Sequence, residues 1–403
     1  MNLFRTKSLS PSTTPDVHIN QKVIILISVL MAMIICLFAN SNGLGMTHDS
    51  IQYWEKSIIF KNTWSLRKAG FTTFLPFQSL EVVLLSILGA NALTIMKYLH
   101  VLFLGGTVFI HLTIAKEIFK HTKTLIIYAL TLVFSTPLLM VHSFLWTEPL
   151  FIVLVSLQWY MLWRFFQRKT SKVLVAILLI SVIYCWQRKA GMLFSLGLIV
   201  VFIAHFASSK KKLAGILVAI SLAIFILYGG LGTTNFIGEH PALSSIPLNL
   251  KNYFGALGGW IFPLPLNYWI RTGLFVFLLV VIALVLKKTL PEMEERRKSY
   301  IRGIIIIILT YVVIRHFYPR PHADEADRFL APIYPGMFFL IIFVWECVLL
   351  KTRKAAFRLI LPVILALWLI YPVIRTFKNA KQWHNRTKIP LLIKKEIQPM
   401  HKK

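Results

Sequence analysis

The feature that most constrains this chain is a series of apolar stretches, each about as long as a lipid bilayer is thick. A membrane helix needs about 20 mostly apolar residues, because backbone polar groups in hydrocarbon must find their hydrogen bonds within the segment. Hydrophobic residues make up 57% of the 403 positions and charged residues only 15%, which is more apolar surface than one soluble core can hide. The sequence therefore predicts an all-α integral membrane protein and excludes a soluble enzyme.

Eleven stretches are apolar enough to cross a bilayer, so the predicted fold is a polytopic bundle of about 11 transmembrane helices. They cover 22–40, 97–115, 125–143, 149–166, 173–187, 190–207, 213–231, 271–286, 301–318, 330–350 and 358–374. The segment 80–95 is also apolar, but it begins near Glu81 and contains Gly89 and Asn91, so hydropathy alone does not decide whether it crosses.

The distribution of basic residues decides the case of 80–95. Lys and Arg close to the ends of membrane helices favour the cytoplasmic side. If 80–95 does not cross and the N-terminus lies inside, the inner connections hold 23 of the 44 Lys and Arg, the outer ones hold 12, and 9 follow residue 374. We therefore predict one membrane domain over 1–374, with 41–96 as a long extracytoplasmic first loop that contains interfacial helices, and a short basic tail over 375–403. The net charge of +29 then belongs to loops at the membrane, and nucleic acid is not expected as a partner.

This topology predicts two more extracytoplasmic segments, 232–270 and 319–329. We expect the functional site on the extracytoplasmic side. In 232–270, glycine and proline are predicted to break any helix. The aromatic residues Trp260, Phe262, Tyr268 and Trp269 in or beside this piece fit the membrane interface.

Two carboxylates, those of Asp49 and Glu148, fall at the same predicted outer boundary. A carboxylate at membrane depth is costly, so it tends to persist only with a partner or a function. The alternative for Asp49 is a cap of a helix that begins there, and the alternative for Glu148, just before Pro149, is a first-turn carboxylate that only serves the dipole of the next helix. Held together at the boundary between lipid and water, the two would suit a general base and an orienting partner.

Cations from other connections are predicted on the same side. Arg188 and Lys189 form a tight turn between two spans, and Arg328 precedes a late span. If the bundle brings these turns together, they suit a phosphate group, since Arg offers two parallel donors and Lys a point charge. The alternatives are snorkelling to lipid headgroups or pairing with Asp324, Glu325 and Asp327.

No metal site is predicted. The three cysteines, Cys36, Cys185 and Cys347, lie far apart in apolar stretches, and the histidines near the outer face lack the spacing of metal ligands. A divalent ion that bridges Asp49 and Glu148 is retained as an alternative, and no other cofactor is expected.

Several short motifs occur together in this order. They are His48-Asp49-Ser50 followed by Tyr53 after the first span, Thr147-Glu148-Pro149 at the start of the fourth, the turn from Arg188 to Gly191, and the Asp-Arg-Phe-Leu-x-Pro-x-Tyr-Pro run from Asp327 to Pro335. The order of these motifs, and their predicted location on the same side of the membrane, resemble the GT-C class of polytopic membrane glycosyltransferases over most of the chain. This class includes protein O-mannosyltransferases and the aminoarabinose transferases of lipid A.

The resemblance implies transfer of a sugar from a polyprenyl-phosphate donor to a glycan, lipid or protein acceptor, usually with inversion. Asp49 would be the general base, Glu148 a second active-site carboxylate, and Arg188 and Arg328 the contacts to the carrier phosphate. His48, Tyr53, Lys189 and Asp327 complete the predicted substrate-binding set. The expected location is a bacterial inner membrane, with the site facing outward.

Two other functions remain open from the sequence. The first is a transporter or flippase of a lipid-linked or anionic solute, which commonly shows inverted repeats and broken helices near the midplane. The second is a membrane acyltransferase or polysaccharide polymerase. An acyltransferase is expected to centre on a histidine within the membrane, and His111 is the histidine that lies well inside a predicted span.

Overall fold

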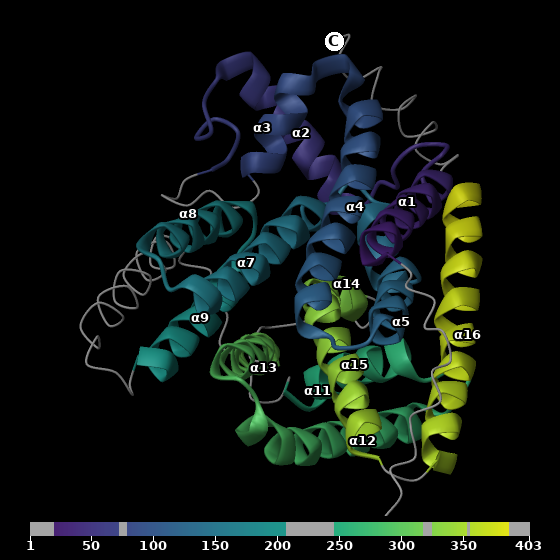
Figure 1. Cartoon of the computed structure of the whole chain (residues 1–403). Helices are drawn as coiled ribbons and strands as arrows, with labels where there is room; N and C mark the ends of the chain where they lie inside the picture. The colour runs from purple at the N-terminus through teal and green to yellow at the C-terminus, as the bar shows by residue number, and fades with distance from the viewer. Residues whose placement is uncertain (1–19, 72–78, 207–245, 317–324, 353–354, 387–403) are drawn as a thin grey trace, which may run out of the picture.

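The computed structural model describes residues 20–71, 79–206, 246–316, 325–352 and 355–386. Every regular element among them is a helix, and their single β contact is an isolated bridge between Gly45 and Phe144 (Figure 1). The predicted all-helical class is confirmed for these residues. The predicted span 213–231 lies outside them.

The helices of the first half are α1 (Gln21–Ala39), α2 (His48–Thr63), α3 (Ser79–Leu88), α4 (Ala92–Ile118), α5 (Thr122–Val133), α6 (Thr136–His142), α7 (Glu148–Arg168), α8 (Ser171–Gln187) and α9 (Ala190–Phe206). Those of the second half are α11 (Ile246–Ile261), α12 (Tyr268–Thr289), α13 (Glu295–His316), α14 (Ala326–Leu330), α15 (Tyr334–Lys351) and α16 (Ala355–Arg386). Three single 3-10 turns connect or extend these helices. The turn η1 (Gly89–Asn91) continues α3 into α4, η3 (Leu290–Glu292) extends α12, and η5 (Ala331–Ile333) joins α14 to α15.

Six helical runs in the described part are long and apolar enough to cross a membrane, and the number is seven if α5 and α6, bent by 43°, form one span. The six are Gln21–Ala39, Ser79–Ile118, Glu148–Arg168, Tyr268–Glu292, Ala326–Lys351 and Pro362–Asn385. The apolar helices α8 and α9 are shorter, at 17 residues each. The chain therefore has the helices of a multi-pass membrane protein, but the predicted count of 11 spans is not confirmed.

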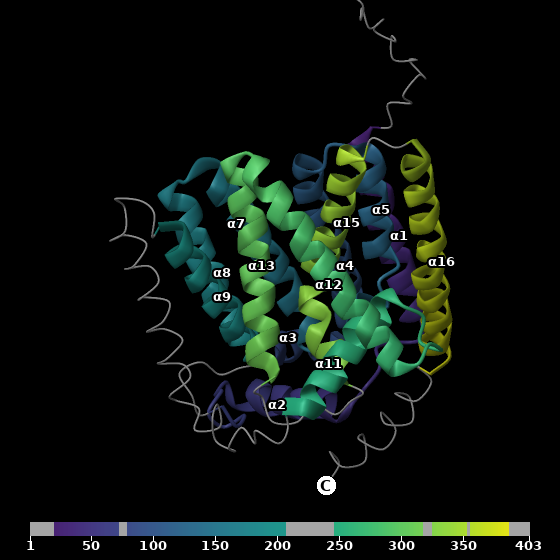
Figure 2. The ribbon, with the colours of Figure 1, turned by 90° about the horizontal axis from the view of Figure 1, so that it is seen from below.

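Helix α2 lies across one end of the bundle, below α4, α7 and α13, which run roughly side by side (Figure 2). Its buried Tyr53 packs in one cluster with Leu85 of α3 and with Ala92 and Met96 at the start of α4. Near the beginning of α3, the Glu81 side chain bonds Gln187 at the end of α8. Helix α3 thus packs against α2 and the end of α8 at this end of the bundle.

The predicted absence of helix in 232–270 is wrong for its second half, where α11 runs from Ile246 to Ile261. Pro247 falls in the first turn, where no backbone N–H is needed. Gly258 lets α11 lie against α12, because an added Cβ would lie 3.1 Å from the carbonyl oxygen of Arg271. Trp260 is consequently buried in the bundle, not exposed at its interface.

The predicted boundary between membrane domain and tail, at residue 374, falls inside α16. This helix continues through Pro362 and Pro372 to Arg386. Beyond the boundary, Ala380 and Trp383 are buried. Residues 375–386 are therefore part of the helical bundle, and the rest of the predicted tail lies outside the described residues.

Candidate functional site

The loop before α2 and the loop before α7 are far apart in the sequence but are joined by hydrogen bonds. The amide of Gly45 donates to the Ser143 carbonyl over 2.8 Å, and the amide of Leu145 donates to the Gly45 carbonyl over 2.9 Å. Only glycine fits here without movement, because an added Cβ would lie 2.5 Å from the Phe144 ring. The indole of Trp146 adds a 2.8 Å hydrogen bond to Thr47 Oγ1. These contacts hold the start of α2 beside the start of α7.

Asp49 lies in the first turn of α2 and does not cap the helix. The N-cap is Thr47, whose amide donates to Ser50 Oγ over 3.0 Å in a capping box. The Asp49 carboxylate is therefore available for other contacts, and its side chain is 41% exposed. The helix N-terminus favours its negative charge. Capping alone, the alternative left open by the sequence, does not describe this residue.

Arg328 of α14 joins Asp49 to Glu148. Its Nη1 lies 2.8 Å from Asp49 Oδ2, and its Nε donates to Glu148 Oε1. Nη1 also lies 3.4 Å from Glu325 Oε1. The guanidinium stacks on Trp146, with Cζ 4.1 Å from the ring centroid. One buried cation thus holds carboxylates from two distant connections at a single point.

Glu148, the first residue of α7, lies between two guanidinium groups. Its side chain is fully buried and pairs with Arg188 Nη1 as well as with Arg328 Nε. Arg188 Nη1 also donates to Thr147 Oγ1 over 2.9 Å. A buried carboxylate without such partners would be strongly destabilising, so the two arginines compensate its charge. The structure brings together Asp49, Glu148, Arg188 and Arg328, and we call these four residues the acid–arginine cluster.

Tyr53 lies one helical turn after Asp49, with its side chain buried beside the cluster. Burial raises the pKa of Tyr53 above its ordinary value, and the negative charge of Glu148 raises it further. The phenol therefore keeps its proton at neutral pH and is a potential hydrogen-bond donor.

The other predicted residues, His48, Lys189 and Asp327, are not members of this cluster. His48 is exposed, and its Nε2 lies 2.9 Å from Gln52 Nε2. Lys189 is exposed in the turn after Arg188. Asp327 turns away from its neighbour Arg328, since consecutive helical residues point about 100° apart. Its carboxylate accepts a 2.6 Å bond from Trp260 Nε1 and lies 3.4 Å from Arg375 Nη2, so it joins α14 to α11 and α16.

A third acid, Glu81, escaped prediction as a site residue. It is buried, and its Oε2 accepts a 3.3 Å bond from Gln187 Nε2, which also donates to the Thr147 carbonyl over 2.9 Å. Within the described residues, Glu81 Oε1 has no hydrogen-bond partner. Glu81 therefore supports the residue before Glu148 through Gln187. The sequence feature that could have identified Glu81 is its position as a single acid at the start of an apolar stretch.

The described residues contain no group of three or more His, Cys, Asp or Glu side chains that could hold a metal ion. Between Asp49 and Glu148, where the sequence left a bridging divalent ion open, the Arg328 guanidinium bonds both carboxylates. The three cysteines are buried free thiols.

No known protein family has a model that matches this chain, and no curated protein matches its sequence. The resemblance to GT-C glycosyltransferases therefore rests on the short motifs alone.

Proposed function

We propose that this chain is a polytopic membrane glycosyltransferase of the GT-C kind. It would move a sugar from a polyprenyl-phosphate donor to a hydroxyl of a glycan, lipid or protein acceptor at the end of the bundle where α2 lies. The supporting observation is that Asp49 and Glu148 share one buried guanidinium, that of Arg328. We further propose a bacterial inner membrane as its location, with this end facing outward.

In the proposed reaction, Asp49 is the general base. Its carboxylate is the most exposed group of the acid–arginine cluster and takes the proton of the acceptor hydroxyl. The acceptor oxygen then forms a bond to the anomeric carbon, while the bond from that carbon to the phosphate oxygen breaks. The polyprenyl phosphate leaves as an anion and needs cations nearby more than a strong acid.

The geometry favours a positioning role for Glu148. Its side chain has no exposed surface, so a substrate cannot reach it, but it fixes both Arg188 and Arg328. Arg188 keeps 14% of its side chain exposed, against 5% for Arg328. We therefore assign contact with the carrier phosphate to Arg188, and the orientation of Asp49 to Arg328.

Replacement of the base tests the proposal. The natural sugar and acceptor would first be identified by mass spectrometry of cell-surface glycans and glycolipids with and without the gene. Purified D49N, reconstituted in lipid, should then lose sugar transfer by about 100-fold or more, the usual contribution of a general base. Glu55→Gln provides the control, because Glu55 is an exposed acid of the same helix. Near-normal turnover of D49N would remove Asp49 from the role of base.

Donor binding gives a second test. Arg188→Ala should weaken binding of polyprenyl phosphate by about tenfold, the value of one charge-assisted hydrogen bond. If wild-type protein in sealed vesicles moves a lipid-linked sugar across the membrane and transfers none of it, the transporter alternative replaces the enzyme.

A further inference from the structure

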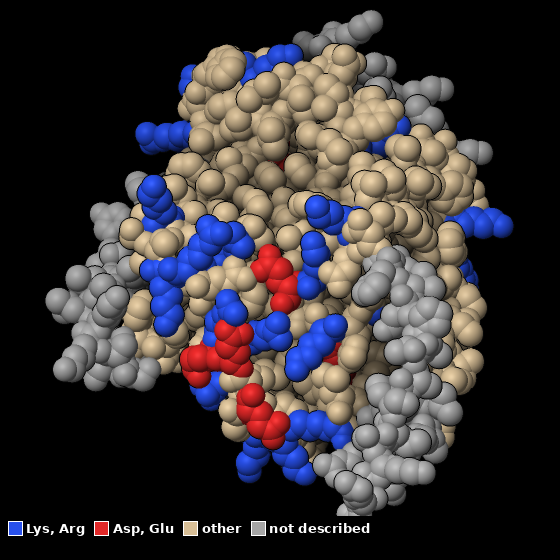
Figure 3. Space-filling view, in the orientation of Figure 1, with Lys and Arg blue, Asp and Glu red and all other residues tan. Residues whose placement is uncertain are grey.

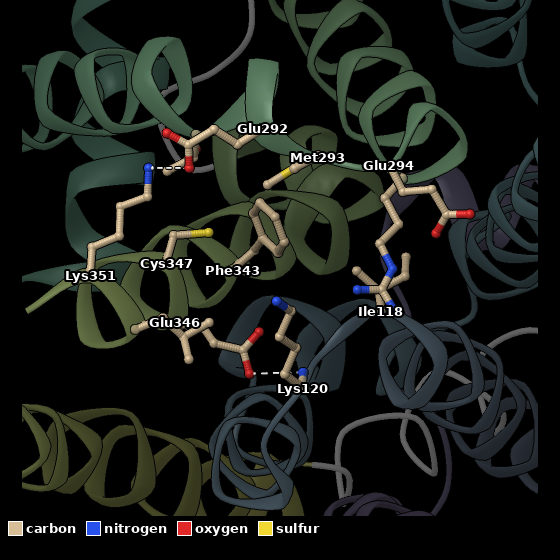
Figure 4. Close-up of a pocket in the computed structure, with 12 residues that line it drawn as sticks. Ile118, Lys120, Glu292, Met293, Glu294, Phe343, Glu346, Cys347 and Lys351 are labelled. Carbon is tan, nitrogen blue, oxygen red and sulfur yellow. Dashed lines mark hydrogen bonds and ion pairs between the residues drawn. The ribbon is translucent and has the colours of Figure 1, made fainter. Parts of the chain in front are cut away.

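A second polar site lies at the opposite end of the bundle, far from the acid–arginine cluster. A pocket of about 330 Å³ opens there between the ends of α4, α12, α13 and α15 (Figure 4). Its wall includes Lys120 just after α4, Glu292 in η3, Arg297 of α13, and Glu346 and Lys351 of α15. In the orientation of Figure 3 this end faces the viewer, and Lys and Arg side chains gather there around a few acids.

The acids of the pocket already have partners. Glu292 Oε2 lies 2.8 Å from Lys351 Nζ, and Glu294 pairs with Arg296 outside the pocket. The buried Glu346 accepts bonds from the amides of Lys120 and His121, over 3.0 and 2.9 Å, and so serves the N-terminus of α5. None of these carboxylates forms an ion pair with Lys120 or Arg297.

Two cations therefore remain without a carboxylate among the described residues. Arg297 Nη2 lies 3.3 Å from the Glu117 carbonyl oxygen and makes no ion pair, and the Lys120 ammonium makes none either. In Figure 4 the Lys120 side chain reaches towards Phe343. A guanidinium and an ammonium on one pocket match the oxygens of a phosphate group.

Most of the remaining wall of the pocket is apolar, with Thr289 and Glu294 as its other polar residues. Ile118, Met293, Phe343 and Leu350 contribute to it, and Leu350 is 43% exposed on the outer surface of α15. The ligand should therefore carry a hydrocarbon part as well as an anion. A soluble phosphate would leave this wall in contact with water, whereas an acyl chain would cover it.

We propose that this pocket binds the phosphate headgroup of an anionic membrane phospholipid, with Lys120 and Arg297 on the phosphate and an acyl chain along Leu350 and α15. Its position at the end of apolar helices places it at headgroup depth, where basic pockets between helices bind anionic lipids. The inference does not depend on the proposed glycosyltransferase activity.

Native mass spectrometry of the full-length protein would test this inference. Delipidated protein would be titrated with phosphatidylglycerol or with phosphatidylcholine. The variant K120Q/R297Q should lose phosphatidylglycerol affinity by about tenfold or more, and its preference over phosphatidylcholine should vanish. The matched control R168Q/K172Q removes two exposed cations from the α7–α8 connection and should lose less than about threefold.

Two further measurements separate the lipid from other anions. Leu350→Ser should weaken phosphatidylglycerol binding, and sn-glycerol 3-phosphate at millimolar concentration should not compete. Effective competition by the soluble phosphate, or equal losses in the pocket variant and in the control, would overturn the proposal. Thermal unfolding of K120Q/R297Q in detergent without added lipid should match that of the wild type, which shows that loss of binding is not loss of fold.

Discussion

At the scale of single residues, Arg328 links the two acids of the candidate site, which come from connections far apart in the sequence. Its guanidinium bonds Asp49 and Glu148 and stacks on Trp146. A lysine could not replace it, since a single ammonium lacks the planar fork that reaches two carboxylates at once. The adjacent Asp327 has a different task, the connection of α14 to α11 and α16.

Glu148→Gln tests the charge balance of this cluster. The substitution keeps the shape of the side chain but leaves two arginines beside a neutral amide, so we expect a loss of about 3–5 kcal/mol in the free energy of unfolding. A fall in Tm in a fixed detergent and lipid mixture would measure it. The double variant E148Q/R188Q should recover part of the loss, because one uncompensated cation is removed. An unchanged Tm for E148Q would show that the pairs contribute no stability.

At the scale of helices, the approach of neighbouring elements depends on small residues at particular crossings. Gly197 of α9 faces Ile307 of α13, where an added Cβ would lie 2.9 Å from the Ile307 Cα. Backbone cannot yield as a flexible side chain can, so the two helices would have to separate. Gly45 also permits a close approach, but there an added Cβ would meet the Phe144 ring and not backbone.

Gly197→Ala should therefore destabilise the protein by about 1–3 kcal/mol, the usual cost of overpacking. Gly106→Ala is the matched control, since Gly106 lies in α4 with open space around its Cβ position. The comparison requires only the Tm of the two variants under identical conditions. Equal Tm values would mean that α9 and α13 separate at no cost.

Gly45→Ala also changes a close approach between elements, but we expect it to reduce sugar transfer more than stability. The Phe144 ring would have to move, which shifts the start of α7 relative to α2 and separates Asp49 from Arg328. We expect a loss of sugar transfer larger than any loss of Tm. Normal transfer by this variant would mean that the loop contact does not position the cluster.

At the scale of the whole molecule, the helices alternate so that the acid–arginine cluster and the pocket of Lys120 and Arg297 lie at opposite ends. The connections after α4 and α12 meet at the pocket, and their many Lys and Arg residues predict a cytoplasmic face. The ends of α1, α6 and α8 meet near the cluster.

Single-cysteine labelling tests this orientation. In a variant without Cys36, Cys185 and Cys347, a cysteine placed at the exposed Glu55 should react with a membrane-impermeant maleimide in intact cells. Cysteines placed at His121 or Lys172 should react only after the membrane is opened. Labelling of position 121 in intact cells would reverse the orientation and move the proposed site to the cytoplasm.

From the sequence alone we could predict the all-helical class, the long apolar helices, most of the helix positions and the meeting of Asp49, Glu148, Arg188 and Arg328. Hydropathy fixes which segments avoid water, and the alternation of spans fixes which connections share an end. Which side chains touch depends on how the helices pack. The tertiary structure turned Arg328 towards Glu148 and Asp327 towards Arg375, buried Glu81 beside Gln187, and formed α11 despite its glycines. These outcomes depend on the rotation and close approach of packed helices, which composition and spacing along one chain do not specify.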